Sequence, residues 1–296
     1  MKRKRQEKML DINVWLEEGL EEIFEGLDGE DEVVKAAKYS LFAGGKRVRP
    51  ALMYTAAEAI GVNVDEIRPY ACALEMIHTY SLIHDDLPAM DNDDLRRGRP
   101  TCHKAFGEAI AILAGDMLLN KAHEVLLEES LKDQNHAKAG LNISTLAGIA
   151  GMIGGQSIDI SSEGKKISLD LLYKLQEKKT GALIEAAVTT PVILKGVGDG
   201  VLTIFKDYAN HLGLAFQIQD DILDVESDEA TLGKTTGKDE RDNKPTFVTL
   251  LGLDGAKDKL MNEEDLCRKA LKDLSDNGLN VSELEELIDK IFARSF

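Results

Sequence analysis

The sequence has no long hydrophobic run and few cysteines. The basic residues 1–5 are followed by a charged, amphipathic stretch, which predicts neither a signal peptide nor a membrane span. The 3 cysteines, Cys72, Cys102 and Cys267, are far apart and form no CxxC or Cys/His ligand pattern. We therefore expect free thiols in a cytoplasmic protein.

Strand-like alternation of polar and apolar residues is also missing, as are linkers, repeats and low-complexity blocks. Apolar residues recur instead at helical spacing in every long segment. A chain of 296 residues with 43% hydrophobic content is long enough to bury a large core. We expect an all-α fold in which residues 1–296 form a single domain, a bundle of about ten helices around a central active-site cavity.

Positive charge is in deficit, with 36 Lys and Arg against 53 Asp and Glu and a net charge of -17. A protein of this charge repels nucleic acid and anionic membranes, so neither is an expected partner. An anionic ligand binds such a protein where metal ions or clustered Lys and Arg reverse the local charge.

The stretch from His84 to Thr101 carries five carboxylates directly ahead of Arg96, Arg97 and Arg99. Clustered carboxylates repel one another unless a cation neutralises them, and oxygen ligands without a nearby cysteine favour Mg²⁺. Mg²⁺ keeps part of its coordination shell for substrate phosphates, and guanidinium groups bind the same oxygens. The stretch predicts a metal site for a phosphorylated substrate. A solvated acidic loop is the alternative.

A second acidic cluster lies in a predicted helix over residues 201–226. At about 100° per residue, Gln217, Asp220 and Asp224 share one face of this helix. Two Asp-rich sites on separate segments, each followed by basic residues such as Lys234, predict several metal ions that hold one polyphosphate between them. The opposite, apolar face of the helix should hold Ala215, Ile218, Ile222 and Val225.

Three cations, Lys46, Arg47 and Arg49, lie on a short connection between two predicted helices. The paired glycines at 44–45 predict the end of the first helix, and Pro50 fits the first turn of the next. A stiff connection of this kind favours an anion clamp. Positive charges that offset a helix C-terminus are the alternative.

A helix predicted over residues 65–85 leads into the first acidic cluster and is broken by Pro88. Leu74, His78 and Ser81 lie on the same side of this helix as Asp85, so this stripe could line a tunnel below the metal site. For His78, a hydrogen-bonded core position is the alternative. Other helices are predicted over residues 7–25, 33–43, 105–128, 137–160, 168–187 and within 246–296.

Three polar or small residues leave their interpretation open. Gln156 and Asp159 interrupt an apolar run, either as satisfied core residues or as pocket residues. Gly181 weakens the middle of a predicted helix, which indicates a kink, a close ligand approach beside Lys179 and Thr180, or plain tolerance.

Taken together, these motifs resemble those of the trans-isoprenyl diphosphate synthases, and the resemblance spans most of the chain. The matching motifs are Gly44 to Pro50, Asp85 to Pro100, Gly154 to Gln156, Lys179 to Gly181, and Phe216 to Asp224 followed by Gly233-Lys234. The resemblance implies a homodimer that uses Mg²⁺, with three ions when substrate is bound. It also implies head-to-tail addition of isopentenyl diphosphate to dimethylallyl and then geranyl diphosphate, with farnesyl diphosphate as product.

The resemblance also implies a role for each matching residue. The metal ligands would be Asp85, Asp91 and Asp220. The residues that hold the allylic diphosphate would be Arg96, Lys179 and Lys234. Those that hold isopentenyl diphosphate would be Lys46, Arg49, His78 and Arg97. The dipoles directed at the allylic carbocation would be those of Thr180 and Gln217.

Product length would be limited by Tyr80 or Ser81, on the helix below Asp85. Tyr80 lies five residues before Asp85, about 7.5 Å down a helix, and the resemblance associates an aromatic residue there with a short product.

The closest alternative function is that of a geranylgeranyl diphosphate synthase. A terpene cyclase needs no second diphosphate site, so Lys46, Arg49 and Arg97 argue against it, and a non-catalytic helical subunit would not need both acidic clusters. Two features depart from the family pattern: residues 245–248 replace a common Tyr-Pro pair, and the N-terminus carries extra basic residues.

Overall fold

The computed structural model describes residues 2–226 and 245–292, and its architecture is all-α, as the sequence predicts. The helices are α1 (Lys2–Phe24), α2 (Glu32–Leu41), α3 (Val48–Ile60), α4 (Val64–Asp85), α5 (Cys102–Phe106), α6 (Glu108–Ser130), α7 (Gln134–Ala147), α8 (Met152–Ser162), α9 (Leu169–Gln176), η1 (Glu177–Gly181), α10 (Ala182–Lys195), α11 (Asp199–Glu226), α14 (Phe247–Asp276) and α15 (Ser282–Phe292). A hairpin of β1 (Leu95–Arg96) and β2 (Arg99–Pro100) follows α4. It was not predicted, because strands of two residues are too short to show alternation.

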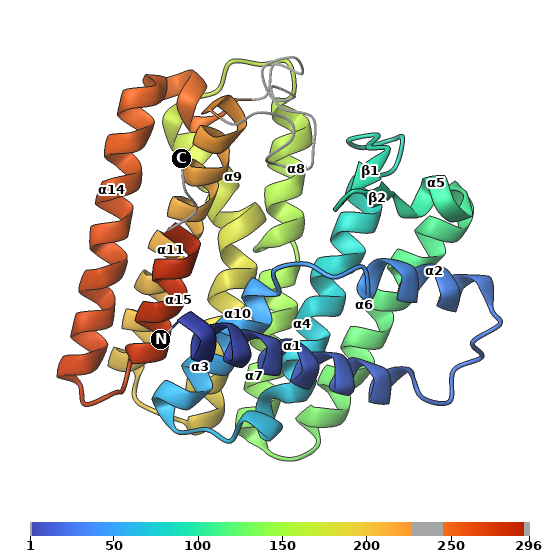
Figure 1. The fold of residues 1–296 in the computed structure, drawn as a ribbon, viewed down its shortest axis with the longest axis horizontal. Helices are drawn as coiled ribbons and strands as arrows, with labels where there is room; N and C mark the ends of the chain where they lie inside the picture. The colour runs from blue at the N-terminus through green and yellow to red at the C-terminus, as the bar shows by residue number, and fades with distance from the viewer. Residues whose placement is uncertain (1, 227–244, 293–296) are drawn as a thin grey trace.

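Most of the helices form a bundle, and α1 runs crosswise to it. Figure 1 shows α4, α6, α8, α10, α11 and α14 running side by side, and α1 packs against α4 and α3. Helix α4 packs against α6, and α11 packs against α14. The apolar stripe expected in the first helix faces the core, since Ile12, Leu16 and Leu20 are buried. The C-terminal end of α4 is thereby held in a fixed position, beside the start of the acidic cluster.

Glycines divide two segments that the sequence indicated as single helices. Gly107, with φ 84, separates α5 from α6. Residues 148–151 separate α7 from α8, and a Cβ at Gly151 would lie 1.9 Å from the carbonyl oxygen of Leu146. Gly107 therefore provides a backbone conformation that favours glycine, and Gly151 allows a close backbone contact, at the points where one helix ends and the next begins.

The prediction for the apolar face of α11 was wrong at one position. Ala215, Ile218 and Ile222 are buried, whereas Val225 is 60% exposed. Val225 lies in the last turn of α11, where helical spacing no longer matches the packing surface.

Ser168 caps the N-terminus of α9, as the sequence predicts. Its hydroxyl oxygen accepts a hydrogen bond from the backbone N of Leu171 at 3.2 Å.

The unusual glycine at 181 ends a π-helical turn. η1 lies between α9 and α10, so the irregularity that Gly181 indicated takes the form of a π-helical turn. Helix α11 packs closely against this turn, because a Cβ at Gly213 would lie 2.9 Å from the Cα of Gly181. Two glycines therefore bring η1 and α11 together, and the wider turn sets the direction of Lys179 and Thr180.

Arg47 does not take part in the predicted anion clamp. Its side chain is buried, donates to the carboxylate of Glu75 on α4, and donates to the carbonyl oxygen of Leu41 at 2.5 Å. Arg47 has φ 45, a left-handed conformation imposed by the sharp turn into α3. The ion pair fixes the connection between α2 and α3 to the centre of the bundle. The other two cations of the connection, Lys46 and Arg49, flank this anchor.

We expect Arg47→Met to lower the free energy of unfolding by about 3 to 5 kcal/mol, because Glu75 would be left as an unpaired buried charge. Urea unfolding followed by circular dichroism measures the loss. The double variant Arg47→Met/Glu75→Leu should recover most of it. Lys35→Met, which removes an exposed ion pair with Glu30, is the matched control and should have a much smaller effect. Equal losses in the two single variants would contradict a structural role for Arg47.

Candidate active site

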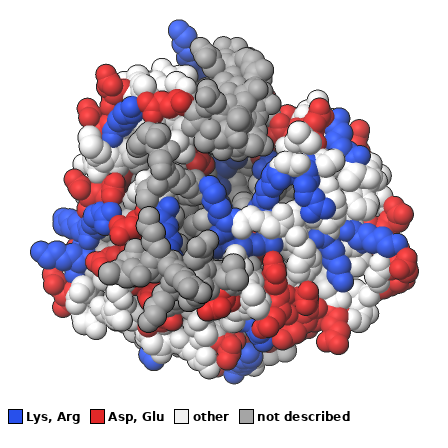
Figure 2. Space-filling model, in the orientation of Figure 1, with Lys and Arg blue, Asp and Glu red and all other residues white. Residues whose placement is uncertain are grey.

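A cavity of about 480 Å³ lies between α4, α8 and η1. The predicted site residues that line it are Arg49, His78, Tyr80, Ser81, Asp85, Lys179 and Thr180. The stripe predicted below Asp85 is therefore found in the lining at His78 and Ser81, while Leu74 is buried in the core. Figure 2 shows Lys and Arg side chains gathered around a hollow in the middle of one face of this acidic protein.

The acidic end of the cavity is centred on Asp85, the last residue of α4. Gln156 on α8 donates from Nε2 to Oδ1 of Asp85 at 2.5 Å. Lys179 on η1 lies 3.9 Å from Oδ2 of Asp85 and 2.5 Å from Oδ2 of Asp159. Gln156 is therefore a pocket residue, as one of the two alternatives predicted, whereas Asp159 does not line the cavity and pairs with Lys179, which does. The loop after α4 returns to the same place, because the backbone N of Asp91 donates to the carbonyl oxygen of Asp85 at 2.8 Å.

The donor set fits a hard divalent cation that shares its shell with a ligand. Asp85 and Asp220 are partly exposed on two different helices, α4 and α11. In the described ranges, 2–226 and 245–292, no three acidic, His or Cys side chains come together as a metal-binding group. An ion here needs further oxygens from elsewhere, which is the usual arrangement for Mg²⁺ beside a phosphorylated substrate. Lys234, which the sequence also placed at this site, lies outside the described residues.

A cationic group lies at the other side of the cavity lining. Nη1 of Arg49 is 3.3 Å from Nε2 of His78. Burial, together with the neighbouring arginines, holds the pKa of His78 well below its usual range. The imidazole is therefore neutral and accepts the hydrogen bond from Arg49. In the part of the chain that the structure describes, the buried Nε of Arg49 has no hydrogen-bond partner, so this guanidinium keeps a donor for a ligand.

Arg97 joins this group by packing on the glycine pair before Lys46. It donates to the carbonyl oxygen of Gly44, and a Cβ at Gly45 would lie 2.6 Å from its Cζ. Gly45 also has φ 130, a conformation that favours glycine. The glycine pair therefore leaves room for Arg97 as well as ending a helix. These contacts favour the anion clamp over charges that merely offset a helix end.

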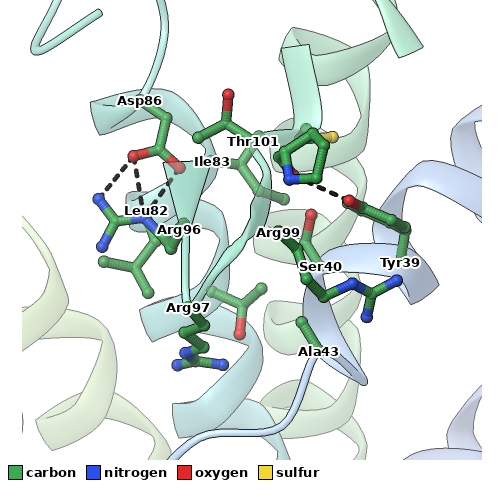
Figure 3. Close-up of a pocket in the computed structure, with 13 residues that line it drawn as sticks. Tyr39, Ser40, Ala43, Leu82, Ile83, Asp86, Arg96, Arg97, Arg99 and Thr101 are labelled. Carbon is green, nitrogen blue, oxygen red and sulfur yellow. Dashed lines mark hydrogen bonds and ion pairs between the residues drawn. The ribbon is translucent and has the colours of Figure 1, made fainter. Parts of the chain in front are cut away.

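Arg96, on the hairpin next to Arg97, is held by Asp86. Its Nε lies 2.9 and 2.8 Å from the two carboxylate oxygens of Asp86, and its Nη2 lies 2.5 Å from Oδ1 (Figure 3). Burial raises the pKa of Asp86, and the hydrogen bonds from Arg96 oppose that rise. Arg96 and Arg97 line a small cavity of about 30 Å³ beside α4.

Thr180 and Gln217 meet where η1 packs on α11. Oγ1 of Thr180 donates to Oε1 of Gln217 at 3.3 Å, and Nε2 of Gln217 donates to Oδ1 of Asp221 at 3.1 Å. Oδ2 of Asp221 accepts a hydrogen bond from the backbone N of Phe247 at 2.8 Å. The segment 245–248, which departs from the family pattern, thus begins α14 in direct contact with the acidic cluster.

Sequence reasoning missed the roles of Asp86, Asp221 and His84. The two aspartates stand beside predicted ligands, so only their burial distinguishes them. His84 lines the cavity, and its Nε2 is 3.0 Å from the carbonyl oxygen of Ile112. Its ring lies against Gly115, where a Cβ would be 2.2 Å from Nε2. The only sequence signal for His84 was its position next to Asp85.

The chain is similar in sequence and in structure to a group of related enzymes. Residues 30–288 match the polyprenyl synthetase family. The farnesyl diphosphate synthase of Escherichia coli is 46% identical over 267 residues, which cover 89% of each chain. A geranyltransferase structure from Legionella pneumophila is 34% identical, with a TM-score of 0.86 and coverage of 99% of this chain and 98% of that one. A Helicobacter pylori geranyltransferase complexed with magnesium and isoprenyl diphosphate is 31% identical, with a TM-score of 0.83 and coverage of 96% and 97%.

None of the helices within residues 2–226 and 245–292 is both long enough and apolar enough to cross a bilayer.

We expect Gly155→Ala to displace η1, because the new Cβ would lie 2.2 Å from the backbone N of Lys179. Overpacking of this kind costs about 1 to 3 kcal/mol of stability, and the displaced Lys179 should lower turnover by at least about tenfold. Thermal unfolding and a steady-state assay measure the two effects. Gly29→Ala is the control, since no atom lies within 4 Å of a Cβ there. Equal behaviour of the two variants would show that η1 adjusts without loss.

Proposed function

This chain belongs to the polyprenyl synthetase family, and on that premise we propose that it condenses isopentenyl diphosphate head to tail with dimethylallyl and then geranyl diphosphate. The product is farnesyl diphosphate, and the activity is that of a farnesyl diphosphate synthase in isoprenoid biosynthesis. The observation that carries this proposal is one cavity lined by Asp85 with Lys179 and, two helical turns earlier on α4, by neutral His78 with Arg49, whose charge is joined by that of nearby Arg97. A terpene cyclase, which ionises a single allylic substrate, needs only the first of these groups.

We propose that the allylic diphosphate binds at the acidic end. Asp85, Asp91 and Asp220 would hold Mg²⁺, with three ions when substrate is bound, and the metal supplies positive charge that stabilises the departing diphosphate. The Helicobacter pylori relative was solved with magnesium and isoprenyl diphosphate, which supports this assignment. Arg96, Lys179 and Lys234 would bind further diphosphate oxygens. Lys179 is the best placed, because it already lies among the carboxylates of Asp85 and Asp159.

We propose that isopentenyl diphosphate binds to Lys46, Arg49, His78 and Arg97. Arg49 retains an unused buried donor, and neutral His78 orients its guanidinium by accepting from Nη1. Two diphosphates are then held with their hydrocarbon parts in the shared cavity. This placement converts a bimolecular reaction into one between neighbours.

In the proposed reaction, the allylic C–O bond ionises and a carbocation forms in the cavity. Oγ1 of Thr180 and the amide of Gln217 stabilise it by their dipoles, since both lie at the junction of η1 and α11. The double bond of isopentenyl diphosphate then attacks the carbocation. The released diphosphate accepts the final proton, so the protein needs no separate base.

We further propose that the whole chain acts as one domain and assembles as a homodimer. Ile112, Leu113, Ile149 and Ile153 are exposed apolar residues, and Ile153 also lines the cavity. A second copy of the chain would cover them. We place the protein in the cytoplasm, because its cysteines are all free, as a reducing compartment would keep them.

Incubation of purified protein with isopentenyl and geranyl diphosphates, with and without Mg²⁺, tests the function. We expect consumption of both substrates only with Mg²⁺, and a fifteen-carbon alcohol after dephosphorylation. A twenty-carbon alcohol would indicate a geranylgeranyl diphosphate synthase. A cyclic hydrocarbon formed from one allylic substrate would indicate a terpene cyclase, and absence of turnover would contradict an enzymatic role.

Product length should respond to Tyr80 and Ser81, which line the cavity below Asp85. The Tyr80 ring packs edge-on against His84, with ring centroids 5.8 Å apart, and His84 is itself held against Gly115. Tyr80→Ala should open the cavity floor and shift the product toward twenty carbons, whereas Ser81→Phe should raise it and favour ten. Chromatography of the dephosphorylated products measures the distribution. An unchanged distribution in both active variants would remove α4 as the length determinant.

A further inference from the structure

The two aspartates of each Asp-Asp pair have different surroundings. The first members, Asp85 and Asp220, are partly exposed, and Asp85 lines the cavity. The second members, Asp86 and Asp221, are 2% and 4% exposed. Consecutive residues in a helix point about 100° apart, so the two carboxylates of a pair point in different directions. Each second carboxylate has a different set of partners.

The carboxylate of Asp86 is occupied by one guanidinium. Nε of Arg96 binds both of its oxygens, and Nη2 binds Oδ1 (Figure 3). A planar guanidinium group that is hydrogen-bonded to a carboxylate through two of its nitrogens has little freedom to rotate. Asp86 therefore determines the direction of Arg96, whose side chain is 33% exposed.

The carboxylate of Asp221 has a donor on each oxygen. Oδ1 accepts from Nε2 of Gln217, and Oδ2 accepts from the backbone N of Phe247. A glutamine amide that donates from nitrogen to Asp221 turns its oxygen away from Asp221, and here the oxygen meets the hydroxyl of Thr180. Asp221 therefore fixes which end of the Gln217 amide faces Thr180.

We infer that the second aspartate of each pair is a positioning residue and not a metal ligand: Asp86 orients Arg96, and Asp221 orients Gln217. The inference rests on the proposed function, in which Arg96 binds the allylic diphosphate and Gln217 faces the carbocation. It divides each acidic motif into one carboxylate for the metal and one for a neighbouring polar side chain. The two positioning residues should affect different steps.

The test compares the same substitution at both members of each pair. Asp86→Asn and Asp221→Asn are measured beside Asp85→Asn and Asp220→Asn, with Glu30→Gln as a surface control whose side chain pairs with Lys35. The readouts are the half-saturating Mg²⁺ concentration, KM for geranyl diphosphate and kcat. The first-member variants should raise the Mg²⁺ requirement by about tenfold or more, and Glu30→Gln should change nothing.

The second-member variants should leave the Mg²⁺ requirement within about twofold of wild type. Asp86→Asn should raise KM for geranyl diphosphate by about 10- to 100-fold, since a charge-assisted contact contributes that factor. Asp221→Asn should lower kcat by about tenfold at little change in KM, because Gln217 is then free to turn its amide. Should either variant fail to fold, as circular dichroism would reveal, the corresponding glutamate substitution retains the charge and is measured in the same way.

Double variants show whether each aspartate acts through its partner. In an Arg96→Ala background, Asp86→Asn should raise KM no further, and in a Gln217→Ala background, Asp221→Asn should lower kcat no further. Additive effects, or a rise in Mg²⁺ requirement equal to that of the first-member variants, would overturn the inference. Wild-type protein that fails to condense the two substrates would instead overturn the proposed function, so the two failures are distinct.

Discussion

The carboxylate of Asp85 receives contacts from two other segments, and the site is arranged about it. Gln156 reaches it from α8 and Lys179 from η1, while the backbone of Asp91 returns to the same helix end. Lys179 is shared with Asp159, so its charge is already balanced before substrate binds. A diphosphate that binds here competes with two carboxylates for that lysine.

Glycines allow these segments to pack closely against one another. Gly155 lets α8 contact the backbone of η1, and Gly213 lets α11 contact the same turn from the other side. Gly45 leaves room for the guanidinium of Arg97. Three elements carrying polar site residues can therefore converge without a bulky side chain between them. The buried pair of Arg47 and Glu75 holds the cationic side of this arrangement to α4.

The sequence predicted the helical architecture and many of the polar residues around the cavity, because helical periodicity, clustered charge and short motifs are local properties. Contacts between residues far apart in the sequence could not be predicted in this way. The spacing of Lys46, Arg47 and Arg49 indicated three equivalent cations, but Arg47 forms an ion pair with Glu75, which is distant in sequence. Likewise, the sequence did not indicate that the carboxylate of Asp86 is paired with Arg96, ten residues further along the chain. The break between α7 and α8, within residues 137–160, depends on close backbone contacts, which helical periodicity does not indicate.

The neutral state of His78 has a consequence for how the protein behaves in a changing environment. Since its pKa lies well below the usual range, the imidazole gains no proton as the surroundings move between mildly acidic and mildly alkaline conditions. The positive charge on that side of the cavity comes instead from guanidinium groups, which stay protonated throughout. Mild acidification therefore adds no positive charge at His78 for an incoming anion.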